Sequence, residues 1–172
     1  MLKRFSSANK GLAAIEFAIL LPLLVLGFFG ATEVSSAVQA AQKTSQTSST
    51  VADLVAQAST ITNADLTNIY AAANAITFPY AVNGETIVIT SLTDNGNNTG
   101  KVAWSAAQNG TPHTVGQVLS VPFGVMPASG SVILAEVSFN FQPPTSYVIT
   151  GAITMNSQFY SRPRRVAVIT RS

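Results

Sequence analysis

One carboxylate, Glu16, lies inside a long apolar block, and it is the residue whose type and position most suggest chemistry. Of the 21 residues from 12 to 32, 16 are hydrophobic and Glu16 is the only charged one. A carboxylate in a membrane helix costs roughly 3 kcal/mol even on a lenient insertion scale. Two explanations stay open: Glu16 reaches the membrane surface, or it pairs with a cation. No Lys or Arg lies between Lys10 and Lys43, so that cation must come from outside the helix.

The block around Glu16 has the length of a membrane span. At about 1.5 Å per residue, residues 12–32 form roughly 31 Å of helix, close to the hydrocarbon thickness of a bilayer. Three basic residues, Lys3, Arg4 and Lys10, precede the block with no acid among them. Because positive residues stay in the cytoplasm, we expect one crossing with a cytoplasmic N-terminus. Glu33, just past the span, is expected to be a solvated boundary residue.

The charges that follow the span argue against a nucleic-acid partner. From Glu33 to the C-terminus the chain has six acids and six bases, so this part has no net charge. Phosphate binding requires clustered basic residues. The only such cluster is Arg162, Arg164 and Arg165, which we interpret as a solvated chain end.

The composition also argues against an enzyme, a cofactor, a metal or a small-molecule substrate. The chain has no cysteine, which excludes disulfides, thiolate zinc sites and a cysteine nucleophile. His113, the only histidine, is expected in a loop without a second metal-ligating histidine. No glycine-rich phosphate loop or dinucleotide fingerprint is present. Trp104, the only tryptophan, is expected to anchor the core of a hairpin.

The segment after the span favours a continued helix. Neither Gly nor Pro occurs between Gly30 and Pro79, so a helical stem over residues 33–58 is expected. Residues 44–50, rich in Ser and Thr, are a candidate break because their hydroxyls compete for backbone hydrogen bonds. Small residues recur at steps of three and four and predict one packing face: Val34, Val38, Ala41, Ser45, Ser48, Ala52 and Val55.

The rest of the chain reads as a small head. Periodic apolar residues predict a helix over residues 63–76, capped by Thr62 or Asn63. Alternating or β-branched runs separated by Gly, Asn and Pro predict strands: residues 86–92, 101–107, 132–141, 153–160 and 165–169. The expected fold class is therefore α+β, with a long N-terminal transmembrane helix and stem followed by a head with an antiparallel sheet.

Both ends of the chain carry a resemblance. A short basic leader ending in Gly11, four residues, and then Glu16 and Phe17 before an apolar run resembles the prepilin processing motif of the tight-adherence (Flp) pilus system. Residues 11–24 resemble the opening of TadE-like proteins, the minor pseudopilins of that system. Near the C-terminus, residues 139–143, 153–155 and 161–164 resemble the closing pattern of the same family.

The resemblance implies that the protein is a minor pseudopilin, a structural component of a pilus assembly machine in the bacterial inner membrane. A prepilin peptidase would cut after Gly11 and leave a chain starting at Leu12. The new ammonium of Leu12 would then pair with Glu16 of an adjacent subunit, with Phe17 in the same helix-assembly segment. The implied partners are the inner membrane, the peptidase and other pilin or minor pseudopilin subunits.

The expected division is a leader (1–11), a transmembrane helix (12–32), a stem (33–58) and a periplasmic or extracellular head (59–172). A conventional signal peptide is the alternative, because small residues at positions 38–41 suit a signal peptidase cut after Ala40. Such a cut would release a secreted or periplasmic binding or adhesion module.

Overall fold

The computed structural model describes residues 9–80 and 84–172. Lys3 and Arg4 of the expected leader lie outside the described residues. The described chain forms two compact units: residues 9–38 with 142–152, and residues 39–141 with 153–172 apart from 81–83. The elements are α1 (Asn9–Ala56), β1 (Thr60–Ile61), α2 (Asn63–Thr77), β2 (Thr86–Asp94), β3 (Thr99–Gln108), β4 (Val118–Ser120), β5 (Ser131–Phe141), β6 (Ile153–Ser161) and β7 (Thr170–Arg171).

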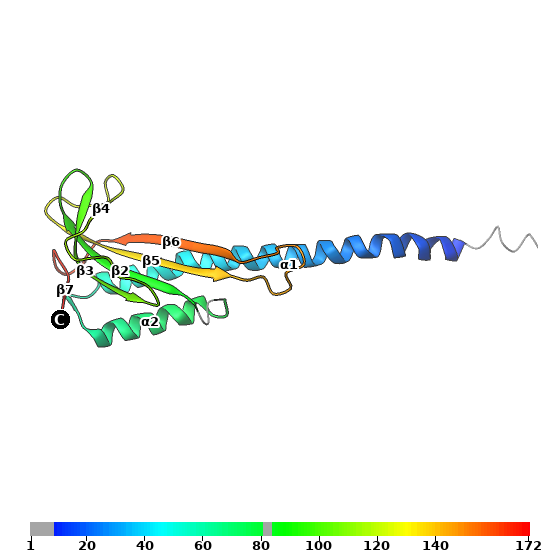
Figure 1. The fold of residues 1–172 in the computed structure, drawn as a ribbon, viewed down its shortest axis with the longest axis horizontal. Helices are drawn as coiled ribbons and strands as arrows, with labels where there is room; N and C mark the ends of the chain where they lie inside the picture. Colours follow the sequence, from blue (N-terminus) through cyan, green and yellow to red (C-terminus); the bar gives the residue numbers. More distant parts are fainter. Residues whose placement is uncertain (1–8, 81–83) are drawn as a thin grey trace, which may run out of the picture. The chain divides into compact units, whose positions relative to one another are not determined.

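Helix α1 is one helix of 48 residues and has no break at residues 44–50 (Figure 1). The hydroxyl groups there bond to the helix itself: Thr44 donates to the Ala40 carbonyl at 2.8 Å, and Ser48 to the Ser45 carbonyl at 2.9 Å. Because these hydroxyls satisfy themselves on the preceding turn, they do not pull the backbone out of its helix. The expected continuous stem is present, and the candidate break was wrong.

The packing face of α1 is only partly the predicted one. Of the predicted stripe, Ser48, Ala52 and Val55 are fully buried, whereas Val34 and Val38 are about half exposed. In the part of α1 before Ser48 that belongs to the second unit, each buried residue comes one position before a residue of the predicted stripe: Ala40, Thr44 and Thr47. One residue is roughly 100° of rotation, so a pattern of small residues fixed the spacing of the face and misplaced its direction.

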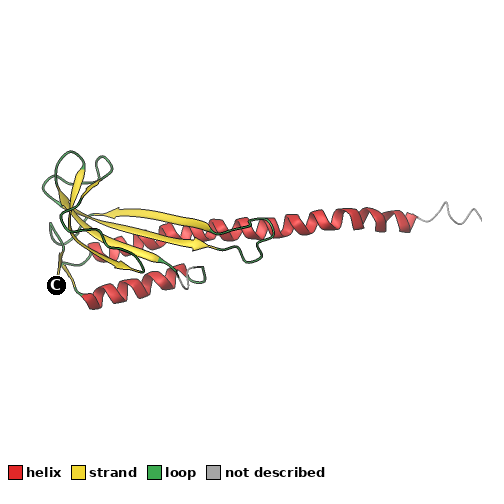
Figure 2. Cartoon of the chain, in the orientation of Figure 1, coloured by secondary structure: helices red, strands yellow, loops and turns green. Residues whose placement is uncertain are grey.

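The second unit is built on a five-stranded antiparallel sheet with strand order β4-β3-β2-β5-β6, drawn as yellow arrows in Figure 2. The core packs the end of α1 and one face of α2 against the sheet, through Val55, Ile69 and Ile133 among others. A smaller cluster around Leu134 lies on the opposite face, because successive strand residues alternate. The predicted α+β fold class, with a long N-terminal helix and an antiparallel sheet, is confirmed.

Local sequence explains most element boundaries in this unit. Thr62 is the N-cap of α2, and it exchanges hydrogen bonds with Asp65 in a capping box. The β2–β3 hairpin turns through Asn97 and Asn98, both at positive φ, a conformation that asparagine tolerates. Trp104 of β3 is 7% exposed, which confirms the prediction that it anchors the core.

The predicted strand over residues 165–169 was wrong. Strand β7 instead covers Thr170–Arg171 and pairs in parallel with β1. Side chains of other strands donate hydrogen bonds to the backbone carbonyls just before β7. The Trp104 Nε1–H donates to the Ile169 carbonyl at 2.7 Å, and the Ser131 hydroxyl donates to the Ala167 carbonyl at 2.6 Å. The sequence shows β-branched residues there, but it does not show that side chains from other strands bind this backbone.

Candidate functional site

The first unit exposes a long apolar helical surface. Nine of its large hydrophobic side chains are 53–71% exposed: Leu12, Ile15, Phe17, Ile19, Leu20, Leu23, Leu24, Leu26 and Phe28. The helix is long and apolar enough to cross a membrane, and its most apolar stretch is not buried within the structure. An apolar surface of this extent is unfavourable in water, so it is expected to be covered by lipid or by another protein.

Glu16 lies on this surface without a partner in the described part of the chain. It is exposed, and no hydrogen bond or ion pair joins it to another described residue. Leu12 lies four positions earlier, so the two residues share one helical face a single turn apart. Phe17 is 59% exposed beside them. The arrangement leaves an acid and apolar side chains exposed side by side; the roles of these residues stay predictions.

The expected processing site lies in the first turn of α1. The helix begins at Asn9, so Gly11 and Leu12 are helical here. Beyond the adjoining part of its own helix, no described atom lies within 4 Å of the place where a Gly11 side chain would stand. The first four N–H groups of a helix have no partner within it, which makes the first turn its weakest part.

Glu33 is not the solvated boundary residue that the sequence suggested. It is 1% exposed, and its carboxylate accepts four hydrogen bonds from the loop that joins β5 to β6, residues 142–152. The backbone N–H groups of Tyr147, Val148 and Ile149 donate at 2.8, 3.1 and 2.7 Å. The Thr145 hydroxyl donates at 2.5 Å. The prediction failed because it took the end of the apolar run as the end of protein contacts.

These hydrogen bonds favour the charged form of Glu33. The bond from the Thr145 hydroxyl and those from the three backbone amides lower its pKa from 4.5 to about 2, against the opposing effect of burial. Successive backbone N–H groups that converge on one point form an anion-binding concavity. No sequence signal marks it, because the donors are backbone amides of an uncharged loop more than 100 positions away.

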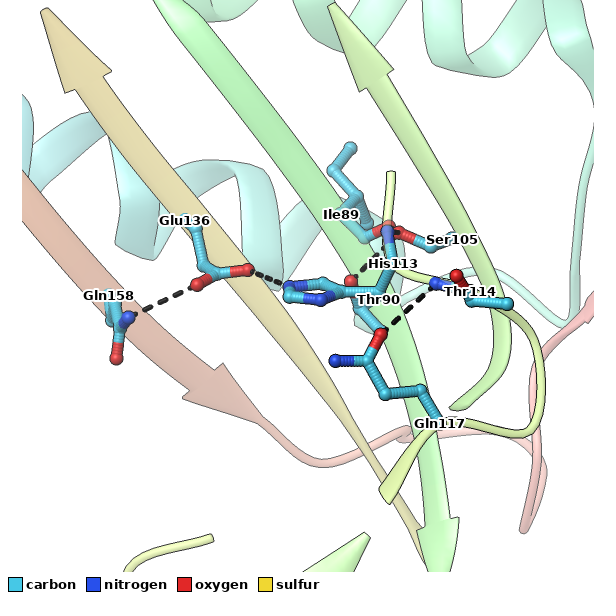
Figure 3. Close-up of polar contacts among 8 residues, drawn as sticks. All are labelled: Ile89, Thr90, Ser105, His113, Thr114, Gln117, Glu136 and Gln158. Atoms are coloured by element: carbon cyan, nitrogen blue, oxygen red, sulfur yellow. Dashed lines mark hydrogen bonds and ion pairs between the residues drawn. The ribbon is translucent and has the colours of Figure 1, made fainter. Parts of the chain in front are cut away.

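A second polar cluster lies on the sheet of the second unit (Figure 3). The His113 Nε2 lies 2.7 Å from a Glu136 carboxylate oxygen, and Gln158 donates to the other oxygen at 3.1 Å. Ser105 accepts from the backbone N–H of His113 at 3.1 Å, and Figure 3 draws no hydrogen bond between Ser105 and the His113 ring. Ser, His and acid are thus not aligned as a proton relay. The contacts attach the loop of His113 to the sheet.

The arginines near the C-terminus bind within the second unit. Arg162 donates to the carbonyls of Val125 and Gly124 at 3.0 and 2.8 Å. Arg164 forms an ion pair with Asp53 on α1. Both arginines are exposed, as the solvated interpretation requires, and their contacts also hold a loop and the C-terminal segment in place.

Fold and site together define a small α+β protein that carries one exposed helix suited to a membrane. A family model described as TadE-like protein matches residues 11–53, which confirms the resemblance seen in the N-terminal residues. The match extends from Gly11 to Asp53 on α1 and does not include the C-terminal pattern around residues 139–164. No curated protein and no solved structure matches the chain. The TadE-like segment supports involvement in a tight-adherence pilus-related system.

Proposed function

We propose that the protein is a minor pseudopilin-like structural component of a tight-adherence (Flp) pilus assembly machine, anchored in the bacterial inner membrane. One observation carries the proposal: the TadE-like match covers residues 11–53, and its first half is the exposed apolar helix. The protein works by assembly and catalyses no reaction. Its helix packs laterally with pilin or other minor subunits, while the N-terminus stays in the cytoplasm and the second unit is periplasmic or extracellular.

In this proposal a prepilin peptidase removes the residues up to Gly11. The open space around Gly11 supports access by the peptidase. Cleavage leaves a free ammonium on Leu12. It also removes Lys3, Arg4 and Lys10, so the processed chain has six bases and seven acids.

Glu16 then pairs with the Leu12 ammonium of an adjacent subunit. Its exposure and the lack of a described partner support this role. In a medium of low dielectric constant an opposite charge is attracted more strongly than in water, so the pair favours association within the membrane. Phe17 and the surrounding aliphatic side chains provide the packing surface.

The alternative, release by a signal peptidase after Ala40, finds no support in the geometry. Ala40 is fully buried and lies within uninterrupted α1. A cut there would also remove Glu33 and leave the donors of residues 145–149 without their acceptor. We therefore do not adopt a secreted module as a second function.

Amino-terminal sequencing of the protein isolated from its native membrane tests the proposal. A start at Leu12 is expected. A start at Ala41 would mean secretion, and retained Met1 would mean a plain anchored protein; both results would contradict the proposal.

Glu16→Gln tests the assembly role separately. The variant should insert normally, because the apolar span is unchanged, but should lose association with pilin subunits and reduce piliation. Glu16→Asp, which keeps the charge, is the matched control and should retain part of both. Normal piliation with Glu16→Gln would rule out the pairing.

A further inference from the structure

The loop of residues 142–152 has an apolar tip that its surroundings do not cover. It contains no charged residue. Tyr147 is 66% exposed and Val148 49% exposed. Loops that face water are usually polar, so two adjacent large apolar side chains at a loop tip indicate contact with a less polar environment than water.

This tip lies beside the last apolar turn of the helix within the first unit. The ring centroid of Tyr147 is 5.1 Å from that of Phe29. The nearest methyl of Val148 is 3.5 Å from the place where a Gly30 side chain would stand. Phe29 precedes the end of the 12–32 span by three residues, about 5 Å along the helix. The tip therefore continues the apolar surface of the helix at the depth where hydrocarbon gives way to headgroups.

The backbone of the tip is prepared for a medium of low polarity. Irregular backbone is tolerated near hydrocarbon only where its polar groups are satisfied. The backbone N–H groups of Tyr147, Val148 and Ile149 all donate hydrogen bonds to the Glu33 carboxylate. The same bonds satisfy the carboxylate, which is otherwise a costly charge at this depth. The three amides of the tip and the acid thus satisfy one another.

We propose that residues 142–152 form an interfacial membrane-docking loop, with Tyr147 and Val148 in the headgroup boundary of the leaflet that the helix leaves at Thr32. The occupant of the patch is lipid, because the patch is continuous with a helical surface that faces acyl chains. Tyrosine suits this zone, since its ring is apolar and its hydroxyl reaches water. The proposal rests on the membrane crossing of residues 12–32, which is part of the proposed function.

The absence of cysteine permits a clean depth measurement. Single-cysteine variants Tyr147→Cys and Val148→Cys of the full chain are labelled with a nitroxide and reconstituted in phosphatidylethanolamine and phosphatidylglycerol vesicles. Leu20→Cys within the span and Phe123→Cys, at a side chain 90% exposed in the second unit, are the references. Collision rates with oxygen and with a water-soluble nickel complex give the depth of each label. We expect labels 147 and 148 to lie between the two references.

The references separate failure of this proposal from failure of the anchor. If label 20 is in lipid but labels 147 and 148 meet nickel as freely as label 123, the docking loop is ruled out and the anchor stands. If label 20 is in water, the anchor falls and the docking loop falls with it. The depth should not change when the protein is diluted in lipid; a change would assign the patch to another protein subunit and overturn the proposal.

A third label keeps both tip side chains in place. Thr150→Cys, at an exposed position, should report a shallow interfacial depth in the otherwise unchanged chain. Adding Tyr147→Ser and Val148→Ser should raise its collision rate with nickel severalfold, because the apolar contact with lipid is lost. An unchanged collision rate in that variant would contradict the proposal.

Discussion

The Glu33 carboxylate of α1 accepts a hydrogen bond from the backbone N–H of Ile149 at 2.7 Å, across 116 positions of the chain. Tyr147 and Val148 donate to the same side chain. A single acid of α1, just past its apolar run, thereby holds the loop between β5 and β6. The end of the apolar run and the loop thus form one structural feature although they are distant in the sequence.

Glu33→Gln should loosen this loop. Glutamine has one acceptor oxygen and no charge, so it can replace only part of the four charge-assisted bonds. We expect faster hydrogen exchange at the amides of residues 147–149, measured by mass spectrometry or NMR on the detergent-solubilised protein. Glu16→Gln, on the same helix without contact to the loop, is the control and should leave these amides unchanged. Equal protection in Glu33→Gln and the unmodified protein would show that the carboxylate does not hold the loop.

Loop docking should depend on acid pH. Docking lowers the pKa of Glu33 from 4.5 to about 2, so its stabilising effect is complete above pH 4.5 and is lost as the pH falls from 4.5 towards 2. The mobility of a nitroxide at Thr150→Cys measures docking directly and should rise across that range. In a Glu33→Gln background the same label should show no such transition; a transition that persists there would assign it to another group.

Trp104→Phe should destabilise the second unit. The change removes the hydrogen bond that the Trp104 Nε1–H donates to the Ile169 carbonyl. Because Ile169 is fully buried, that carbonyl is left unsatisfied. Loss of one partner of a buried hydrogen bond costs about 1–3 kcal/mol. The midpoint of urea unfolding, followed by circular dichroism, should fall accordingly. Phe123→Ala, at a side chain 90% exposed, is the control and should change stability by less than about 0.5 kcal/mol.

Glu85→Gln should stabilise the second unit at neutral pH. Glu85 is 1% exposed, and burial raises its pKa despite the hydrogen bond from the Thr77 hydroxyl at 2.8 Å. A raised pKa means that folding favours the protonated acid, so stability is highest below the unfolded pKa and falls as the pH rises. The gain in melting temperature from Glu85→Gln should be present at pH 7 and shrink in acid. A gain that grows in acid would contradict the burial argument.

Local patterns predicted the elements of this chain well. The uncharged run of hydrophobic residues after Glu16 marks α1, and alternating residues mark β2, β3, β5 and β6. The capping residue Thr62 and the turn asparagines are equally local signals. The candidate site on α1 was visible for the same reason, because Gly11, Glu16 and Phe17 lie within seven consecutive positions and the matched family segment begins there.

Contacts between distant segments could not be predicted in this way. Whether α1 buries Ala40 or Ala41 depends on how the second unit packs, since one residue of rotation exchanges them. The backbone of Ile169 is bound by a tryptophan 65 positions earlier rather than by a strand. The burial of Glu33 arises from backbone amides, which every residue except proline carries and no pattern distinguishes. Local residue patterns are thus enough to predict a membrane-suited helix and a sheet. Contacts between distant segments set which of Glu16 and Glu33 is exposed and which is enclosed.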